Sequence, residues 1–317
     1  MVTHIAAIAL GLVLDRLIGD PPEWPHPVRW LGTLISTLTK KLNKSPKAFR
    51  NGFFLTMIVA GLAFLAAYWI VSFGYSVHWL VGMLVEALLI ASGLAQKSLR
   101  LAAEDVYRPL VEKDMVQARQ KLSWIVGRDT EQLNESEITR GVVETVSENT
   151  SDGVTAPLFW AFLLGAPGLW LYKAVNTCDS MVGYKNAEFE RFGYASAKID
   201  DVLNLIPSRI TGLLILIMTK NERSLPIEKR ISEWRRDAKK HPSPNSGWLE
   251  AATAIQLGVE LGGINTYKGI RSNRAKMGTK VVELEADHIR EAVRHMHIAT
   301  GWFFIIFAVG GLLLELT

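Results

Sequence analysis

The chain holds a run of 22 residues without a charged side chain, at 52–73. About 20 consecutive apolar residues suffice for a helix to cross a bilayer, whereas a buried helix of a soluble domain is usually shorter. A second run at 77–95 is interrupted only by Glu86, and a third lies at 298–314. We therefore expect an all-α, multi-pass integral membrane protein with spans at these three places, and four to five spans in all.

The basic residues are gathered in two places, although the formal net charge of the 317-residue chain is only +4. One group lies at 40–50, directly before the first apolar run, and the other lies at 220–294. Loops rich in Lys and Arg stay in the cytoplasm, so we expect 97–150 and 220–297 to be cytoplasmic helical segments. Aromatic residues do not interleave with these basic groups in the way that stacks bases, so nucleic acid is not an expected partner.

A fourth apolar stretch, 154–175, contains the sequence Gly-Ala-Pro-Gly at its centre. Two glycines and a proline disfavour a continuous helix, and each half has about ten residues, too few to cross a bilayer. We expect a re-entrant helical hairpin rather than a span. Such a hairpin returns its two flanking segments to the same face of the membrane, where they can form one site.

Polar side chains are dense on both sides of this hairpin. The sequence reads ETVSENTSDG from Glu144, KAVNTCDSMVGYKN from Lys173 and DDVLNLIPSR from Asp200. Carboxylates and amides are costly beside lipid unless they pair, bind a ligand or face water. This density indicates chemistry or transport within one membrane-embedded domain over 1–317.

The candidate residues fall into three groups by the chemistry of their side chains. Ionisable groups near the hairpin are candidates for catalysis: Glu144, Glu148, Lys173 and Asp179. Carboxylates with the hard oxygen ligands that Mg²⁺ prefers are candidates for metal binding: Asp152, Asp200 and Asp201. Polar groups of the same zone, of the proline-rich N-terminal segment and of the HPSPNSG turn are candidates for binding substrate or nucleotide: Asp15, Asn149, Asn176, Lys185, Asn186, Arg209, His241 and Asn245.

Simpler explanations exist for several of these residues. Glu144 can form a solvated pair with Arg140, and Lys173 can extend to the membrane interface. The adjacent carboxylates of Asp200 and Asp201 can stabilise a helix N-terminus.

Cys178 is the only cysteine, which excludes a disulfide framework and a multi-cysteine metal site. The common nucleotide and protease fingerprints are absent. We also expect one tightly packed helix over EAATAIQLGVELGG, from Glu250 onward.

Five segments of the chain resemble the cobinamide-phosphate synthase family of cobalamin biosynthesis (CobD/CbiB). They read LDRLIGDP with HPV within 14–28, ETVSENTSDGVTAPLFW at 144–160, KAVNTCDSMVGYKN at 173–186, FGYASAKIDDVLNLIPSR at 192–209 and HPSPNSGWLEAA at 241–252. They occur in order over nearly the whole chain. Ser208 is a slight departure, because alanine is expected there.

The resemblance implies a membrane enzyme that faces the cytoplasm from the inner membrane of the cell. It implies that 1-amino-2-propanol or its O-phosphate is joined to the corrinoid adenosylcobyric acid, with ATP as co-substrate and Mg²⁺. Other late enzymes of the pathway are implied as partners beside the bilayer itself. Our hypothesis is an acyl phosphate that the amine attacks. A transporter with broken helices and a non-catalytic membrane regulator on the same scaffold are the alternatives.

Overall fold

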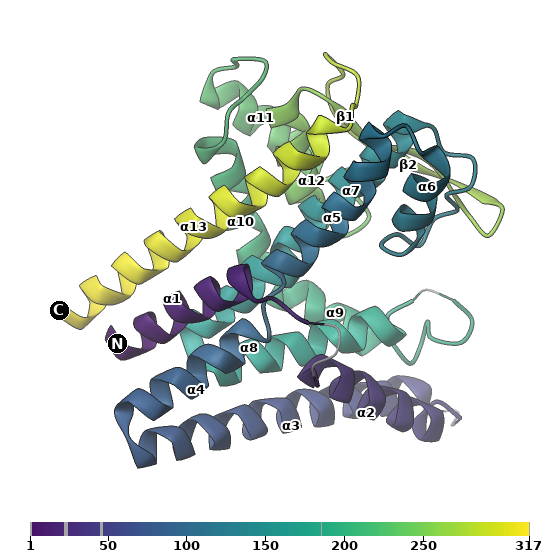
Figure 1. Cartoon of the computed structure of the whole chain (residues 1–317). Helices are drawn as coiled ribbons and strands as arrows, with labels where there is room; N and C mark the ends of the chain where they lie inside the picture. Colours follow the sequence, from purple (N-terminus) through teal and green to yellow (C-terminus); the bar gives the residue numbers. More distant parts are fainter. Residues whose placement is uncertain (1, 22–24, 45–46, 185, 317) are drawn as a thin grey trace. The chain divides into compact units, whose positions relative to one another are not determined.

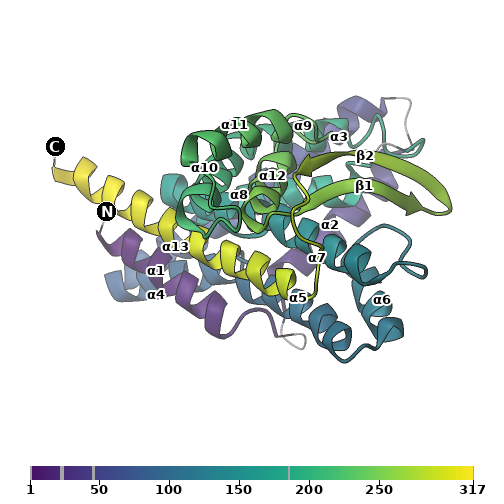
Figure 2. The same ribbon diagram turned by 90° about the horizontal axis from the view of Figure 1, so that it is seen from above.

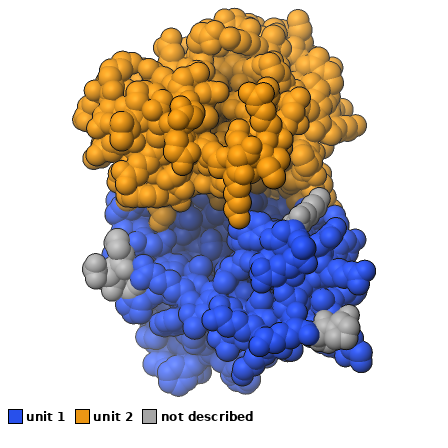
Figure 3. All heavy atoms as spheres, turned by 90° about the vertical axis from the view of Figure 1, so that its right-hand side faces the viewer, with its two compact units in different colours: residues 1–97, 152–204, 304–317 blue, residues 98–151, 205–303 orange. Residues whose placement is uncertain are grey.

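The computed structural model describes residues 2–21, 25–44, 47–184 and 186–316. Figure 1 shows a mainly helical chain with one small sheet. The sequence predicts one domain, and within it the structure distinguishes two compact units, neither of which is a continuous stretch of chain (Figure 3). Unit 1 comprises residues 1–97, 152–204 and 304–317, and unit 2 comprises residues 98–151 and 205–303.

Unit 1 consists of helices only, among the residues that the structure describes. Its elements are α1 (Val2–Leu17), α2 (Pro27–Leu42), α3 (Ala48–Val77), α4 (Trp79–Ala91), α8 (Ala156–Val182), α9 (Tyr194–Leu203) and the last part of α13 (Asp287–Leu316). Helix α3 packs against α4 and α8. It buries a stripe of small residues that includes Gly52, Ala60 and Ala67, and exposes large apolar ones such as Phe73. Small residues let helices approach closely within a membrane.

Unit 2 combines helices with the sheet. Its elements are α5 (Gln96–Val111), α6 (Met115–Ser123), α7 (Glu135–Thr150), α10 (Leu205–Met218), α11 (Ile227–Ala238), α12 (Ser246–Leu257), β1 (Glu260–Tyr267), β2 (Ile270–Gly278) and most of α13. A short π-helical turn at Ser151–Thr155 continues the chain from α7 into α8.

Four segments are long and apolar enough to cross a membrane: Ala48–Val77, Trp79–Val111, Glu135–Val182 and Asp287–Glu315. Helices α9 and α10 meet at a bend of 48° and together would supply a fifth. These findings confirm the predicted helical membrane protein, with four to five segments long and apolar enough to span.

The chain doubles back inside α8. Gly165 has φ 70° and ψ −166°, a conformation that only glycine adopts readily. The Tyr172 hydroxyl donates a hydrogen bond to the main-chain oxygen of Asp152 at 3.4 Å. In a straight helix these two residues would lie about 30 Å apart, at roughly 1.5 Å per residue. The predicted helical hairpin at 154–175 is therefore confirmed.

Glu86 holds the tip of this hairpin. Its carboxylate accepts hydrogen bonds from His4 Nδ1 and the Tyr75 hydroxyl, both at 2.9 Å, and from the Ala166 main-chain N–H at 3.4 Å. The break at Gly165 frees that N–H from the helix, and a buried N–H needs an acceptor. Glu86, the one charged residue in the second apolar run, therefore supplies the acceptor that the broken helix lacks.

The expectation of one helix over EAATAIQLGVELGG was wrong beyond Leu257. Gly258 adopts φ 68° and ends α12 with a left-handed cap, as glycine commonly does. The chain then forms the antiparallel strands β1 and β2, which lie side by side in Figure 2. Lys268 and Gly269 form their turn with φ 50° and 78°, the two positive angles of a tight hairpin turn.

Candidate functional site

In unit 1, the two arms of the hairpin and α9 bring together a set of polar residues that we call the hairpin cluster: Asp152, Tyr172, Lys173, Asn176, Asp179, Asp200 and Asn204. All of them except Tyr172 lie in the polar segments singled out from the sequence, Asn204 as part of DDVLNLIPSR. The sequence signal for Tyr172 was a helical spacing shared with Asn176, which by itself is common.

Asp200 is the centre of the cluster and is only 8% exposed. Asn176 Nδ2 donates to its Oδ1 at 3.1 Å, and Asn204 Nδ2 approaches its Oδ2 at 3.5 Å. Asn204 also donates to the Tyr172 hydroxyl at 2.7 Å, and that hydroxyl reaches the main chain of Asp152. The two amides thus hold the Asp200 carboxylate of α9 against the second arm of the hairpin.

Asp179 lies near enough to Asp200 for the two carboxylates to interact electrostatically. Within the described residues, no group of three or more His, Cys, Asp and Glu side chains is arranged to hold a metal ion. Mg²⁺ is usually held by one or two carboxylates, with substrate phosphates and water as the other ligands. The Asp179–Asp200 pair with its amide neighbours fits that kind of site.

Lys173 is the cation of the hairpin cluster. It is half-buried and interacts electrostatically with Asp15, Asp20 and Asp152. In the part of the chain that the structure describes, its ammonium forms no hydrogen bond and no ion pair. The ammonium therefore feels the charge of three carboxylates without forming an ion pair with them.

Asp15, near the end of α1, is 1% exposed. Its Oδ2 accepts from the main-chain and side-chain nitrogens of Gln96 at 3.0 and 3.2 Å. Burial raises the pKa of Asp15 to about 6 although the Gln96 hydrogen bonds oppose the shift, and the charge of Asp20 adds to it. The other oxygen, Oδ1, is buried and meets no donor in good hydrogen-bond geometry among the described residues, although the main-chain N–H of Lys97 is near enough to oppose the rise in the pKa of Asp15. Asp20 accepts from His26 Nε2 at 2.9 Å.

Several predicted residues have local partners instead. Asp201, although adjacent to Asp200, forms an ion pair with Lys198 at 3.1 Å. Asn149 donates to the Thr145 carbonyl of its own helix at 2.9 Å, and Asn186 accepts from the Phe189 N–H at 2.9 Å in the turn after α8. Lys185 lies outside the described residues.

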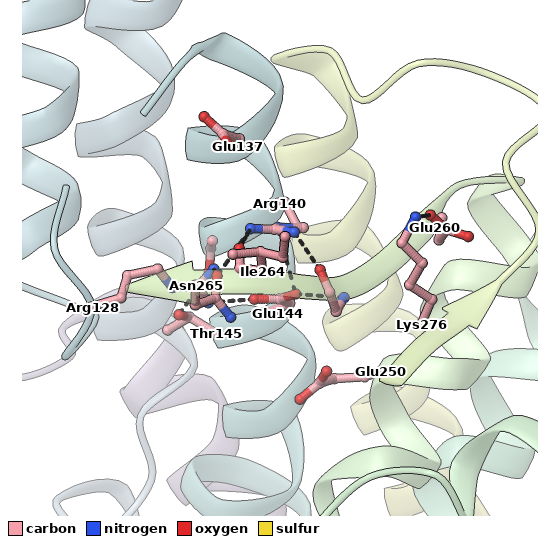
Figure 4. A network of polar contacts seen from close by, with 12 residues as sticks. Arg128, Glu137, Arg140, Glu144, Thr145, Glu250, Glu260, Ile264, Asn265 and Lys276 are labelled. Carbon is pink, nitrogen blue, oxygen red and sulfur yellow. Dashed lines mark hydrogen bonds and ion pairs between the residues drawn. The ribbon is translucent and has the colours of Figure 1, made fainter. Parts of the chain in front are cut away.

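In unit 2, Glu144 is the centre of a buried network, shown in Figure 4. One of its oxygens accepts from Arg128, and the other accepts from the Gly262 N–H at 2.8 Å. Arg128 and Arg140 both donate to Asn265 Oδ1, at 2.7 and 2.9 Å. Glu144 is 3% exposed, so this network joins α7 to β1 inside the unit. Arg128 and Asn265 were missed because they are 137 residues apart in the chain.

The HPSPNSG loop, residues 241–247, packs around Glu148. Ser246 Oγ donates to Glu148 Oε1 at 2.8 Å. The Ser243 N–H donates to His241 Nδ1 at 3.0 Å, so a neutral His241 carries its proton on Nε2. That nitrogen lies 3.5 Å from Oε1 of Glu250.

Glu250 was not singled out as a functional residue from the sequence, because it sits in an otherwise apolar helix. It is 1% exposed, and burial raises its pKa well above the ordinary range, with the charges of Glu144 and Glu148 adding to the effect. Burial lowers the pKa of His241. Both shifts favour the neutral forms of the two side chains.

Arg209 fastens the same loop to α10. Its guanidinium donates to Asn245 Oδ1 at 2.7 Å and to the Pro244 carbonyl at 2.8 Å. It also lies over the Trp248 ring, 4.9 Å from the ring centre. Arg209, His241 and Asn245, which were predicted separately, are thus neighbours in one loop structure.

Comparisons with known proteins identify the family of the chain. The model of the family described as CobD/Cbib protein matches residues 8–296. The chain is 49% identical to the cobalamin biosynthesis protein CobD of Halalkalibacterium halodurans, over 99% of both chains. It is 43% identical to the cobalamin biosynthesis protein CbiB of Salmonella paratyphi B, over 93% of this chain and 94% of that protein. No solved structure matches. The chain therefore belongs to the CobD/CbiB protein family.

Proposed function

We propose that this protein acts in cobalamin biosynthesis as a membrane enzyme that forms an amide bond. The acid is the corrinoid adenosylcobyric acid, and the amine is 1-amino-2-propanol or its O-phosphate. Support comes from relatives named as cobalamin biosynthesis proteins that the chain matches nearly end to end. The observation that carries the proposal is the hairpin cluster, a buried set of acids, amides and one lysine in a membrane protein.

The chemistry requires activation of the carboxylate. In the proposed reaction, a corrinoid carboxylate oxygen attacks the γ-phosphorus of ATP, and ADP leaves. The amine nitrogen then attacks the carbonyl of the acyl phosphate, phosphate leaves, and one amine proton is released. The products are the amide, ADP, phosphate and a proton. Each step moves negative charge between oxygens, so fixed positive groups accelerate it.

The hairpin cluster supplies suitable groups for the phosphoryl steps. Asp179 and Asp200 would hold Mg²⁺, which when bound neutralises phosphate charge. Lys173 would balance the charge that develops on the transferred phosphoryl group. Asp152, whose main chain is held by Tyr172, would complete the metal environment, whereas Asp201 is engaged with Lys198.

The second set of groups is in unit 2. Glu148 is half-buried with one oxygen bonded to Ser246, and we assign it the role of general base. The HPSPNSG loop, with Arg209 and Asn245, would bind phosphate or a polar corrin side chain. Glu144 has both oxygens bonded by the protein, so we assign it to positioning rather than to chemistry.

We place the enzyme in the cell membrane with its active site toward the cytoplasm. The basic groups at 40–50 and 220–294 favour that orientation. ATP is available on that side, and other late enzymes of the pathway could receive the product there.

The test is ligation in detergent. Purified protein is incubated with adenosylcobyric acid, ATP, Mg²⁺ and each amine, and the product mass is measured together with ADP. We expect the mass of the amide, with loss of turnover in Asp179→Asn and Glu148→Gln. Asp105→Asn serves as the control, because this exposed carboxylate pairs only with Lys121 at 3.6 Å among the described residues.

Two outcomes would contradict the proposal. One is normal turnover in both variants. The other is no product from the wild-type protein together with corrinoid uptake into proteoliposomes, which would indicate a transporter.

A further inference from the structure

The N-terminal end of α3 carries positive charge that no acidic residue of its own stretch balances. Residues 24–85 contain no Asp and no Glu. Five of their basic side chains gather where α2 ends and α3 begins, and we call them the basic corner: Lys40, Lys41, Lys44, Lys47 and Arg50. All five are exposed. The first three of these lysines and Arg50 form no ion pair with a residue that the structure describes.

Two asparagines fix the shape of this corner. Asn51 Nδ2 donates to the Leu42 carbonyl at 2.9 Å, which ties the start of α3 to the end of α2. Asn43 Nδ2 donates to the Glu188 carbonyl at 3.1 Å, which ties the same turn to the loop between α8 and α9. The carboxylates of that loop, on Glu188 and Glu190, form no ion pair with the corner among the described residues. The cations are therefore held near one another although they repel.

The apolar run of α3 places the corner at the depth of lipid headgroups. This run begins at Gly52, so along a helix Arg50 precedes it by about 3 Å and Lys47 by about 8 Å. The headgroup layer on each side of a bilayer is about 5–8 Å thick. The bond between Asn51 and Leu42 brings the lysines at the end of α2 to the same level. Side chains of this length can reach lipid phosphates while their methylene groups lie on apolar surface.

Exposed aromatic rings adjoin the corner. Phe49 is 55% exposed, and its ring centre lies 5.7 Å from that of Tyr194, which is 51% exposed. Phe53, one turn further along α3, is also exposed. Aromatic belts of this kind are typical of the membrane interface. A soluble anion at the corner would leave these rings in water, whereas a phospholipid covers them with its glycerol and acyl chains.

We propose that the basic corner and the rings beside it bind an anionic phospholipid. The lipid phosphate accepts hydrogen bonds from the lysines and the arginine, and the apolar part of the lipid lies on Phe49 and Tyr194. A zwitterionic lipid carries a cationic group beyond its phosphate, and the five cations of the corner repel that group. The surface therefore selects lipids of net negative charge, whatever reaction the protein performs.

The probe is phosphatidylglycerol, mixed in detergent micelles with an equal amount of phosphatidylcholine. The full-length protein is repurified, and mass spectrometry counts the lipids that stay bound. We expect phosphatidylglycerol to be enriched about 10-fold or more on the wild-type protein, since each basic residue near an anionic headgroup contributes roughly a factor of five. At about 1 M salt, where charges are screened within ~3 Å, the enrichment should disappear. That comparison needs no variant.

A triple variant assigns the effect to the corner. Lys40→Gln/Lys41→Gln/Lys44→Gln should lower the enrichment to about twofold or less. The matched control, Lys229→Gln/Arg235→Gln/Lys239→Gln, removes the same net charge from α11, where these three exposed cations form no ion pair with a described residue. It should keep the wild-type enrichment. Equal loss in both triple variants would overturn the proposal, because net charge alone would then attract the lipid.

Two results on the wild-type protein would also overturn it. One is equal retention of the two lipids at low salt. The other is displacement of phosphatidylglycerol by glycerol phosphate at the same concentration, which would indicate a site for soluble anions. Selective retention by the wild type and the control, with loss from the corner variant, supports a lipid-binding surface even in a protein that forms no amide.

Discussion

The Glu144 network of unit 2 and the Asp15–Lys173 pair of unit 1 are both buried sets of charges, but they are completed differently. Glu144 has a donor on each oxygen, from Arg128 and Gly262. Among the described residues, Gln96 donates to one oxygen of Asp15 only, and Lys173 has no carboxylate within ion-pair distance. The charges of the first set are thus paired within unit 2, whereas those of the second set interact only at longer range.

The difference follows from the cost of burying charge. A buried ion pair that satisfies all its atoms is close to neutral for stability, but loss of one partner is expensive. Such a network fixes the position of β1 on α7. Buried charges that lack direct partners lower the stability of the folded state. Charges of this kind are common at functional sites.

The largest effect should come from removing one partner of the complete network. Glu144→Gln leaves Arg128 buried without its counter-charge, and we expect a loss of about 3–5 kcal/mol in the free energy of unfolding. Thermal or denaturant unfolding in detergent measures it. Glu135→Gln, at the start of the same helix, removes an exposed pair with Lys113 and should cost less than about 1 kcal/mol. An equal loss of unfolding free energy in the two variants would contradict the difference between the buried and the exposed ion pair.

The next effect concerns turnover at the hairpin cluster. Asp200→Asn should lower kcat roughly 100- to 1,000-fold, because the carboxylate at the centre of the cluster loses its charge while the amide keeps its shape. Unfolding should change little, since the side-chain oxygen of the new asparagine can still accept from Asn176, and only the longer contact with Asn204 at 3.5 Å loses its acceptor. Ligation and unfolding are measured on one preparation, with Asp105→Asn beside it. A parallel loss of fold and activity would make Asp200 structural.

A smaller effect should separate stability from function at Asp15. Its pKa rises from 3.8 to about 6 on folding, so between those values the folded state holds more protons than the unfolded state. Stability therefore falls as pH rises from about 4 to about 6. At ~1.4 kcal/mol for each pKa unit, the penalty above pH 6 is about 3 kcal/mol. Asp15→Asn should remove it, and should change nothing below pH 4.

The measurement is the unfolding midpoint of both proteins between pH 4 and pH 8. A variant that is more stable yet turns over more slowly would show that the buried charge is retained for function. A variant that is less stable at pH 7 would place Asp15 with the complete network instead.

The smallest effect concerns the hairpin tip. Gly165→Ala forces a side chain into a left-handed conformation, with its Cβ 2.9 Å from Glu86 Oε1, and should cost about 1–3 kcal/mol. Gly301→Ala is the matched control, because nothing lies within 4 Å of its Cβ. A helical Gly→Ala change there should stabilise by about 0.5–1 kcal/mol. Equal shifts in the unfolding midpoint would contradict the strained tip.

Local sequence signals predicted much of the fold. The uncharged runs identified the spans because length and hydropathy alone decide whether a helix can cross a bilayer. The Gly-Ala-Pro-Gly sequence predicted the hairpin because it disrupts a helix whatever surrounds it. The β-hairpin was missed, since Gly258 followed by a strand reads much like a glycine tolerated within a helix.

The candidate site was predicted as a set of residues but not as a set of contacts. Asp200 and Asp201 look equivalent in the sequence, and so do Glu144 and Glu148. In the structure Asp200 faces Asn176 while Asp201 meets Lys198, and Glu144 is enclosed while Glu148 remains half-buried. Asp200 and Asp201 are successive helical positions and point in different directions, whereas Glu144 and Glu148 lie one turn apart on the same face. Only packing separates the members of each pair.

The sequence by itself determined that the chain is a helical membrane protein with a broken helix and a dense polar zone, because these properties depend on composition and short-range pattern. Only the tertiary structure decided which charges are completed by the protein and which are left open. Arg128 meets Glu144 and Asn265, and Asp15 meets Gln96, across 16, 137 and 81 residues of chain. No local pattern encodes such pairs, since burial and partners arise only when distant segments pack together.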